Sequence, residues 1–164
     1  MRDRVPLAAV LLAALVLLAG CVGTVTDAAN DGEYDRTTVT AYDEDGTELA
    51  TVEVRVADTY SKRYTGLSDT ESLGEDEGML FVHDEEDRYA YVMRDMAFPI
   101  DIVFVAANGT ITRIHHAELP PEGTGESDLT RYRGVGKYVL EVPYGWTDEH
   151  DVCEGDRIEI AGDY

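Results

Sequence analysis

The stretch Pro99–Ile114, PIDIVFVAANGTITRI, decides the fold because it holds two strand-like runs on either side of a turn. In the first run, alternate residues point to opposite faces, and both sets are apolar apart from Asp101. A strand that is apolar on both faces is typical of the centre of a sheet. Asn108 and Gly109 supply the two positive φ angles that a tight hairpin turn uses. The stretch therefore predicts a β-hairpin whose first strand is central.

Asp101 is the residue that does not fit this apolar strand. A buried carboxylate without partners costs several kcal/mol, so it needs hydrogen-bond donors. We expect these donors to be Arg94 or the backbone amides of the corner 93–98 that precedes the strand. We interpret Asp101 as a structural staple, with a small cleft for a polar ligand as the alternative. The candidate pocket or structural corner consists of Met93, Arg94, Asp95, Pro99 and Asp101.

The residues before and after this hairpin also form short strand-like runs. Alternating valines and polar residues at 51–56 predict a half-buried strand, which Asp45-Gly46 joins to the run before it as a hairpin. Residues 78–83 and 88–93 predict two strands separated by an acidic turn at 84–87. The proline-, glycine- and acid-rich segment 118–133 predicts a long exposed loop, and strands at 136–146 and 156–162 end the domain.

One short helix is expected, at Asp58–Leu67. Asp58 or Ser61 is available as its N-cap, and Gly66 is available to end it. About eight strands and one helix without repeats predict a mainly β fold, a compact and mostly antiparallel barrel or sandwich.

The N-terminal residues have the pattern of an export signal. A short basic start precedes the apolar run Leu7–Ala19, which is too short to span a membrane. The run ends in Leu-Ala-Gly-Cys, which resembles a lipobox and implies cleavage before Cys21 and lipid on its sulfur. We expect a signal peptide at 1–20, a lipidated tether at 21–35 and a single domain at 36–164, held on the outer face of the cell membrane. The alternatives are plain secretion or an uncleaved N-terminal anchor.

The charge of the chain is strongly negative. The 34 acidic residues outnumber the 13 basic ones, for a net charge of −21. This composition excludes the basic surface that nucleic-acid binding needs. It resembles the proteins of salt-loving archaea, so we expect a fold that needs high salt to screen its own repulsion.

Few residues suggest a metal, a cofactor or a modification. His115 and His116 are neighbours on a strand, so their side chains point to opposite faces. His150 and Cys153 have half the spacing of a zinc site without a second pair nearby. We therefore expect no metal and no cofactor, and we interpret Cys153 as a small buried residue. Asn108 begins an Asn-Gly-Thr sequon and is a candidate glycosylation site in an exported protein.

Several ordered motifs resemble those of the domain-of-unknown-function family numbered 192. They are Gly66-Leu67, Gly78-Met79-Leu80-Phe81, Met93 followed by Pro99 and Asp101–Phe104, Val139–Val142, and Gly155-Asp156. The chain differs from the usual family residues at Ser68 and at Arg94-Asp95-Met96, where a pocket is expected. The resemblance implies a small β-rich domain, often exported or tethered to a membrane, with no established cofactor.

Three functions remain open at this point. The first is a membrane-tethered binding or accessory module of the cell envelope, for an envelope protein or a small polar ligand. The second is a structural lipoprotein with no ligand, which a filled barrel would favour. The third is a hydrolase-like enzyme that uses Asp101 and a histidine, which a histidine within hydrogen-bond reach of Asp101 would favour.

Overall fold

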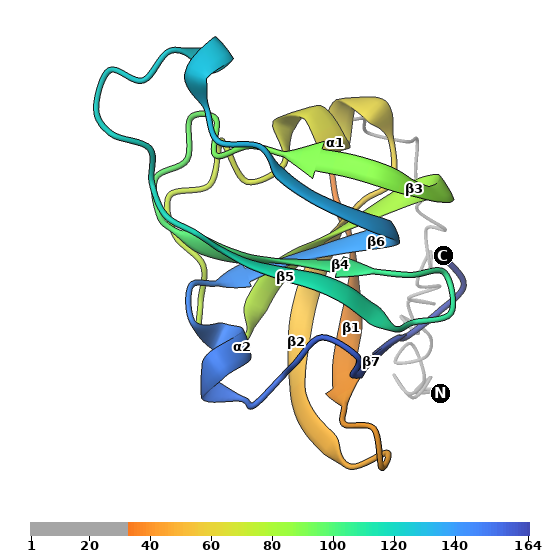
Figure 1. Ribbon diagram of the computed structural model, residues 1–164. Coiled ribbons are helices and arrows are strands. Elements are labelled where there is room, and N and C mark those ends of the chain that lie inside the picture. Colours follow the sequence, from red (N-terminus) through yellow and green to blue (C-terminus); the bar gives the residue numbers. More distant parts are fainter. Residues whose placement is uncertain (1–32) are drawn as a thin grey trace, which may run out of the picture.

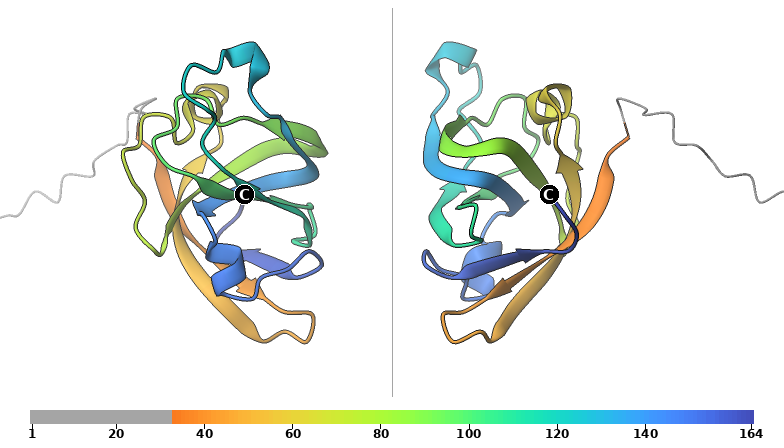
Figure 2. Two further views of the ribbon diagram at one scale, coloured as in Figure 1. Left: turned by 60° about the vertical axis from the view of Figure 1, so that its left-hand side comes forward. Right: turned by 90° about the vertical axis from the view of Figure 1, so that its right-hand side faces the viewer.

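The computed structural model describes residues 33–164, which form one curled sheet with two short α-helices (Figure 1). Seven strands lie in the order β5-β4-β6-β3-β2-β1-β7, and neighbours are antiparallel except for the parallel pair β2–β3. The views in Figure 2 show how strongly the sheet curls, and a bridge between Thr110 and Arg157 joins its two ends. The expected mainly β, barrel-like class is confirmed. In chain order the elements are β1 (Asp35–Tyr42), β2 (Glu48–Ala57), α1 (Tyr60–Thr65), β3 (Glu77–Tyr91), β4 (Ile100–Val105), β5 (Ile111–Ala117), the 3-10 helix η1 (Glu126–Asp128), β6 (Tyr132–Pro143), α2 (Trp146–Glu149) and β7 (Arg157–Ile160).

Both expected hairpins are present, but one turn differs from its prediction. The β1–β2 turn contains Gly46 with a φ of 83°, as Asp45-Gly46 indicated. In the β4–β5 turn only Gly109 has a positive φ, 88°, while the Asn108 side chain accepts a hydrogen bond from the Thr110 amide at 3.0 Å. The register shifts beside this turn, so the extra residue is absorbed as an irregularity of the ladder. The prediction of two positive-φ residues was wrong.

The two strands expected at 78–83 and 88–93 are one long bent strand, β3. Its pairing with β6 shifts register between Val82 and Asp87, so the acidic residues at 84–87 lie in a bulge of the strand. A bulge bends a strand without ending it. The sequence pattern of a turn and that of a bulge are alike here, and the expected number of strands was one too high for that reason.

Of the two short α-helices in residues 33–164, sequence patterns indicated only one. In α1 the Thr59 side chain accepts a hydrogen bond from the Lys62 amide, so Thr59 is the N-cap instead of Asp58 or Ser61. Gly66 ends α1 with a φ of 53°, as expected. The second helix, α2, begins at Trp146, the last residue of the strand expected at 136–146, and lies in the connection to β7, where no helix was expected. The two helices lie at opposite sides of the curled sheet (Figures 1 and 2).

The sheet has an apolar cluster on each face, and strand β4 contributes to both. All six β4 residues are buried, and β4 pairs with β5 on one side and β6 on the other, so it is an interior strand, second from one end of the sheet. Ile100, Ile102 and Phe104 pack in the cluster on the side of α1, with Met79, Phe81 and Leu67. Val103 and Val105 pack in the cluster on the side of α2, with Leu80, Leu140 and Trp146. Because residues alternate along a strand, Asp101 belongs to the α2 side.

The expected signal peptide, the lipid on Cys21 and most of the tether fall on residues 1–32, outside the described part of the chain. Within residues 33–164, no helix has the length and apolar character needed to cross a membrane.

Candidate functional site

Asp101 is fully buried and all its hydrogen-bond partners come from elements other than its own strand. Its Oδ1 accepts hydrogen bonds from the Gly145 amide at 3.0 Å and from His116 Nδ1 at 2.7 Å. Its Oδ2 accepts hydrogen bonds from the Thr147 amide at 2.9 Å and from the Thr147 hydroxyl at 2.7 Å. Asp101 therefore joins β4 to β5 and caps the start of α2. Asp101 thus has the hydrogen bonds that a structural staple needs, but the prediction that Arg94 or the amides 93–98 donate them was wrong.

His116 reaches Asp101 from β5, the neighbouring strand. The hydrogen bond with Asp101 raises the pKa of the His116 imidazole, while partial burial opposes that rise. The other ring nitrogen, Nε2, lies 3.9 Å from Asp148 Oδ1. Neither Asp101 nor His116 lines the pocket described below. The hydrogen bond with Asp101 therefore fixes the orientation of the His116 ring. The Asp148 carboxylate lies near the other ring nitrogen.

The other residues of the expected corner do not gather around Asp101. Met93 is buried in the cluster on the α1 side. Arg94 donates a hydrogen bond to the Tyr64 carbonyl at 2.5 Å and lies 3.8 Å from Glu126. Asp95 is exposed with a φ of 54°, in the turn before Pro99. The corner thus separates into a staple on one side of the sheet and an arginine on the other.

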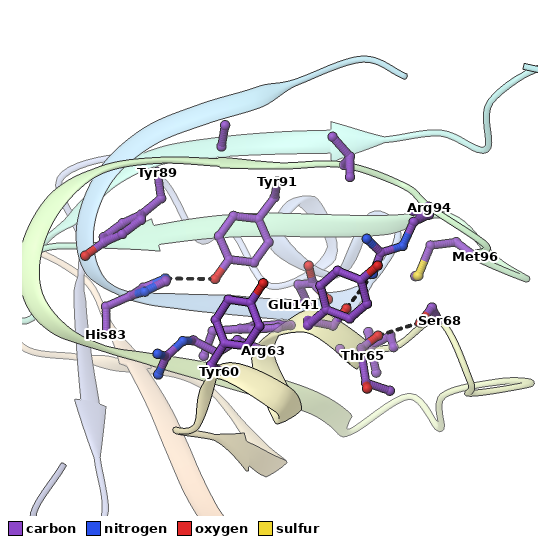
Figure 3. Close-up of a pocket in the computed structure, with 16 residues that line it drawn as sticks. Tyr60, Arg63, Thr65, Ser68, His83, Tyr89, Tyr91, Arg94, Met96 and Glu141 are labelled. Atoms are coloured by element: carbon purple, nitrogen blue, oxygen red, sulfur yellow. Dashed lines mark hydrogen bonds between the residues drawn. The ribbon is translucent and has the colours of Figure 1, made fainter. Parts of the chain in front are cut away.

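Arg94 belongs to a pocket of about 420 Å³ between α1, β3 and the segment after β3 (Figure 3). In Figure 3, Glu141 lies in the middle of the group, with His83 and Tyr89 at one end and Arg94 and Met96 at the other. Of the positions where we expected a pocket, Ser68 and Arg94-Asp95-Met96, this pocket is lined by Ser68, Arg94 and Met96 but not by Asp95. Its lining residues are Tyr60, Arg63, Tyr64, Thr65, Gly66, Leu67, Ser68, Phe81, His83, Tyr89, Ala90, Tyr91, Val92, Arg94, Met96 and Glu141.

Glu141 is the most unusual residue of this pocket. It lies in β6 directly between Met79 of β3 and Ile102 of β4, so its neighbours within the sheet are apolar. Only 6% of the residue is exposed. Burial raises the pKa of the Glu141 carboxyl from 4.5 to about 8, and within residues 33–164 no positive charge or hydrogen bond offsets this rise. At neutral pH the free pocket therefore holds mostly the protonated acid.

The end of the pocket at His83 is a small aromatic network. The His83 ring stacks on the Tyr89 ring, with centroids 3.6 Å apart, and its Nε2 lies 3.0 Å from the Tyr91 hydroxyl. Burial, followed by the charge of Arg63, lowers the pKa of His83 to about 4. Burial, followed by the charge of Glu141, raises the pKa of Tyr91 well above 10. Both side chains are therefore neutral at physiological pH.

The two arginines of the pocket are bound to other groups of the protein. Arg63 donates two hydrogen bonds to carbonyl oxygens, to Asp58 at 2.6 Å and to Val82 at 2.7 Å. The Arg94 guanidinium lies over the Tyr64 ring, 4.1 Å from its centroid. Tyr60 and Tyr64 stack on each other at the rim and remain 78% and 58% exposed. Large exposed aromatic side chains beside an open pocket are typical of a binding site.

The remaining candidate residues lie apart from this pocket. His115 Nε2 lies 2.9 Å from the Arg133 carbonyl, and His150 Nδ1 lies 2.8 Å from the Trp146 carbonyl. Cys153 is exposed, so its interpretation as a buried residue was wrong. Asn108 is exposed in its turn. Among residues 33–164, no three His, Cys, Asp or Glu side chains are grouped as a metal site would require.

Glu141 was missed at the sequence level, although its signal is the same as that of Asp101. Each is a single acid within an apolar strand, in VLEVP and in PIDIVFV. The argument that a buried carboxylate needs donors applies to both. The pattern shows the burial of each acid, whereas the presence or absence of donors depends on chain segments that are distant in the sequence.

Residues 33–164 form a β-rich, half-barrel domain with an aromatic-walled pocket that contains a buried acid. The chain belongs to the family DUF192, described as Uncharacterized ACR, COG1430, which matches residues 40–160.

Two solved structures are similar to this chain. One is described as a putative transcription regulator from Sinorhizobium meliloti, with 29% identity over 79% of this chain and 96% of that chain and a TM-score of 0.69. The other is a protein of unknown function from Novosphingobium aromaticivorans, with 27% identity over 74% of this chain and 83% of that chain and a TM-score of 0.65. No curated protein matches the sequence at a significant level.

Proposed function

We propose that this chain is a lipid-anchored binding domain of the cell envelope, which holds a small organic molecule in the pocket around Glu141. The observation that carries the proposal is an acid that is more than nine-tenths buried and unpartnered within residues 33–164, in a pocket of about 420 Å³. Pockets of this size are large enough for a small ligand. A structural lipoprotein without a ligand would gain nothing from the cost of this acid.

The negative charge of the chain argues against a role on nucleic acids. One similar structure is described as a putative transcription regulator, but this chain carries a net charge of −21. Phosphate backbones attract clustered Lys and Arg side chains and repel carboxylates.

The anchor is proposed from the sequence, because the apolar run ends in Leu-Ala-Gly-Cys and a polar segment follows it. Two lipid chains hold a protein on a membrane far more firmly than one. Cys21→Ser should release the domain from the membrane fraction of cells, or leave it unprocessed. Unchanged processing together with unchanged membrane retention would show that lipid on Cys21 is not the anchor.

The binding role can be tested before the natural ligand is known. We expect a panel of small cationic, neutral and anionic compounds to include members that shift the NMR resonances of the pocket residues. Ser68→Trp should abolish those shifts, because Ser68 lines the pocket and a large side chain would fill it.

Asp69→Trp is the matched control, since Asp69 is exposed and outside the pocket lining. Binding to both variants, or to neither the wild type nor the control, would contradict a binding role for this pocket.

A further inference from the structure

The pocket around Glu141 has the features of a site for positive charge. We propose that its ligand is a small organic cation, an amine or a quaternary ammonium group, held by the Glu141 carboxylate and by the faces of the surrounding aromatic rings. This inference rests on the proposed function and specifies the class of ligand.

The Glu141 carboxyl has no paired positive charge within residues 33–164, and a bound cation would supply one. Its partners across the sheet, Met79 and Ile102, offer no hydrogen-bond donor from their side chains. Within residues 33–164, burial is the one cause that shifts the pKa of the Glu141 carboxyl. An ammonium group next to it would form a charge pair in a site with little water, where such a pair is strong. A neutral ligand would leave the acid protonated and would use it only as one hydrogen-bonding group.

The walls of the pocket are the kind that binds ammonium groups. Five of the lining residues are aromatic, and the rim residues among them are exposed. Cations are attracted to the faces of aromatic rings, most strongly where water is excluded. The five residues are Tyr60, Tyr64, Phe81, Tyr89 and Tyr91.

The two arginines of the pocket do not fill the place of this cation. Arg63 is held by the carbonyls of Asp58 and Val82, and Arg94 is held by the Tyr64 carbonyl. Neither lowers the pKa of Glu141, so their charge is not directed at the floor. Beyond the pocket, the strongly negative chain, with a net charge of −21 over its full length, attracts cations.

The affinity for a cation should depend on pH through Glu141. The titratable and charged side chains that line the pocket with it come from α1, β3 and the segment after β3, namely Tyr60, Arg63, Tyr64, His83, Tyr89, Tyr91 and Arg94. His83 and Tyr91 are neutral between pH 6 and 8, because their pKa values are about 4 and well above 10. Glu141 alone changes charge in this range. Binding should therefore strengthen by up to about tenfold per pH unit as pH rises toward the pKa of Glu141.

The experiment compares choline with its uncharged isostere 3,3-dimethyl-1-butanol by calorimetric titration in molar potassium chloride. High salt screens the exposed carboxylates and leaves a buried charge pair largely intact. We expect choline to bind the wild type at least about tenfold more tightly than the isostere, a gap that one desolvated charge pair readily supplies.

Glu141→Gln should remove that preference while retaining the weak binding of the isostere. Glu48→Gln is the matched control, because Glu48 is exposed on β2 and the substitution removes one carboxylate outside the pocket. Its preference for choline should equal that of the wild type.

Equal binding of the two compounds by the wild type, or an unchanged preference in Glu141→Gln, would overturn the cation proposal. If only neutral or anionic members of the panel bind in a way that Ser68→Trp abolishes, the binding role stands and the cation proposal fails. If no member binds, the binding role itself fails.

Discussion

Two buried carboxylates on neighbouring strands of this sheet have opposite surroundings. Asp101 of β4 and Glu141 of β6 are one step apart in the ladder, since Asp101 pairs with Val142 and Glu141 with Ile102. They point to opposite faces. Asp101 accepts four hydrogen bonds. Within residues 33–164, no hydrogen bond or positive charge offsets the pKa rise that burial causes at Glu141. The hydrogen bonds of Asp101 compensate for its burial, whereas the burial of Glu141 has a cost that the proposed binding role would explain.

The largest expected effect is at Asp101. Asp101→Ala should lower the free energy of unfolding by about 3–5 kcal/mol, because it leaves the buried donors of Gly145 and Thr147 without an acceptor. Asp101→Asn should be milder, since its amide retains one acceptor oxygen. Denaturant unfolding at one fixed high salt concentration measures both variants. Equal or higher stability of Asp101→Ala would mean that Asp101 is not a staple.

Glu141 should respond in the opposite direction. Its pKa of about 8 in the folded protein exceeds the ordinary value of 4.5, so the folded state holds the proton more tightly and stability falls as pH rises from 4.5 to 8. Glu141→Gln removes this loss and should stabilise the fold by about 3 kcal/mol at pH 7.

The same variant should gain less than about 1 kcal/mol at pH 5. At that pH the Glu141 carboxyl is protonated in the folded protein, and the pH lies only about half a unit above its ordinary pKa of 4.5 in the unfolded chain. Unfolding curves of wild type and Glu141→Gln at both pH values test this difference. A gain that is the same at pH 5 and pH 7 would contradict the raised pKa. His83 remains in both proteins, so its own contribution between pH 4 and 6.5 cancels in the comparison.

Much of the fold was predictable from local patterns in the sequence. The alternation in β2, the two-sided apolar pattern of β4 and the glycine that ends α1 each depend on residues close together in the chain. The acidic segment in β3 predicts a turn and forms a bulge instead, because an acidic polar segment is compatible with both. Helix α2 was missed because Asp101, a residue 44 positions before Gly145, caps its first turn.

The candidate site was predictable only in part. A buried position can be inferred from the apolar residues around an acid, as it was for Asp101. The partners of that acid cannot, because His116, Gly145 and Thr147 come from other elements. The expected contact between Arg94 and Asp101 failed for a geometric reason, since the two residues lie on opposite faces of the sheet. The pocket at Glu141 requires α1, β3 and β6 to be placed together.

Added salt should screen the exposed carboxylates much more than the two buried ones. The chain has 34 acidic residues, most of them in the domain, so the domain should unfold at a midpoint temperature that rises with potassium chloride, by several degrees for each 1 kcal/mol or so of reduced repulsion. The stability differences caused by Asp101→Ala and Glu141→Gln should change little over the same range, because salt screens buried groups weakly. Thermal melts from dilute to molar salt provide both comparisons. A flat midpoint would contradict the expected dependence on salt.

The smallest expected effect is at His116, and it distinguishes a structural histidine from a catalytic one. His116 supplies one of four hydrogen bonds to Asp101, and its side chain is 39% exposed, so water can replace part of its contribution. His116→Ala should therefore cost less than about 1 kcal/mol at pH 6. The hydrogen bond with Asp101 raises the pKa of His116 above 6.5, so its stabilising effect is complete below pH 6.5 and is lost as pH rises through the raised pKa. Unfolding curves of wild type and His116→Ala at pH 6 and pH 9 should show a larger difference at pH 6.

A hydrolase that used this histidine would instead need a substrate near Nε2, where Asp148 lies at 3.9 Å. Ester hydrolysis by the wild type that disappears in His116→Ala, with the fold intact, would restore the enzymatic hypothesis and move the functional site to the α2 side of the sheet.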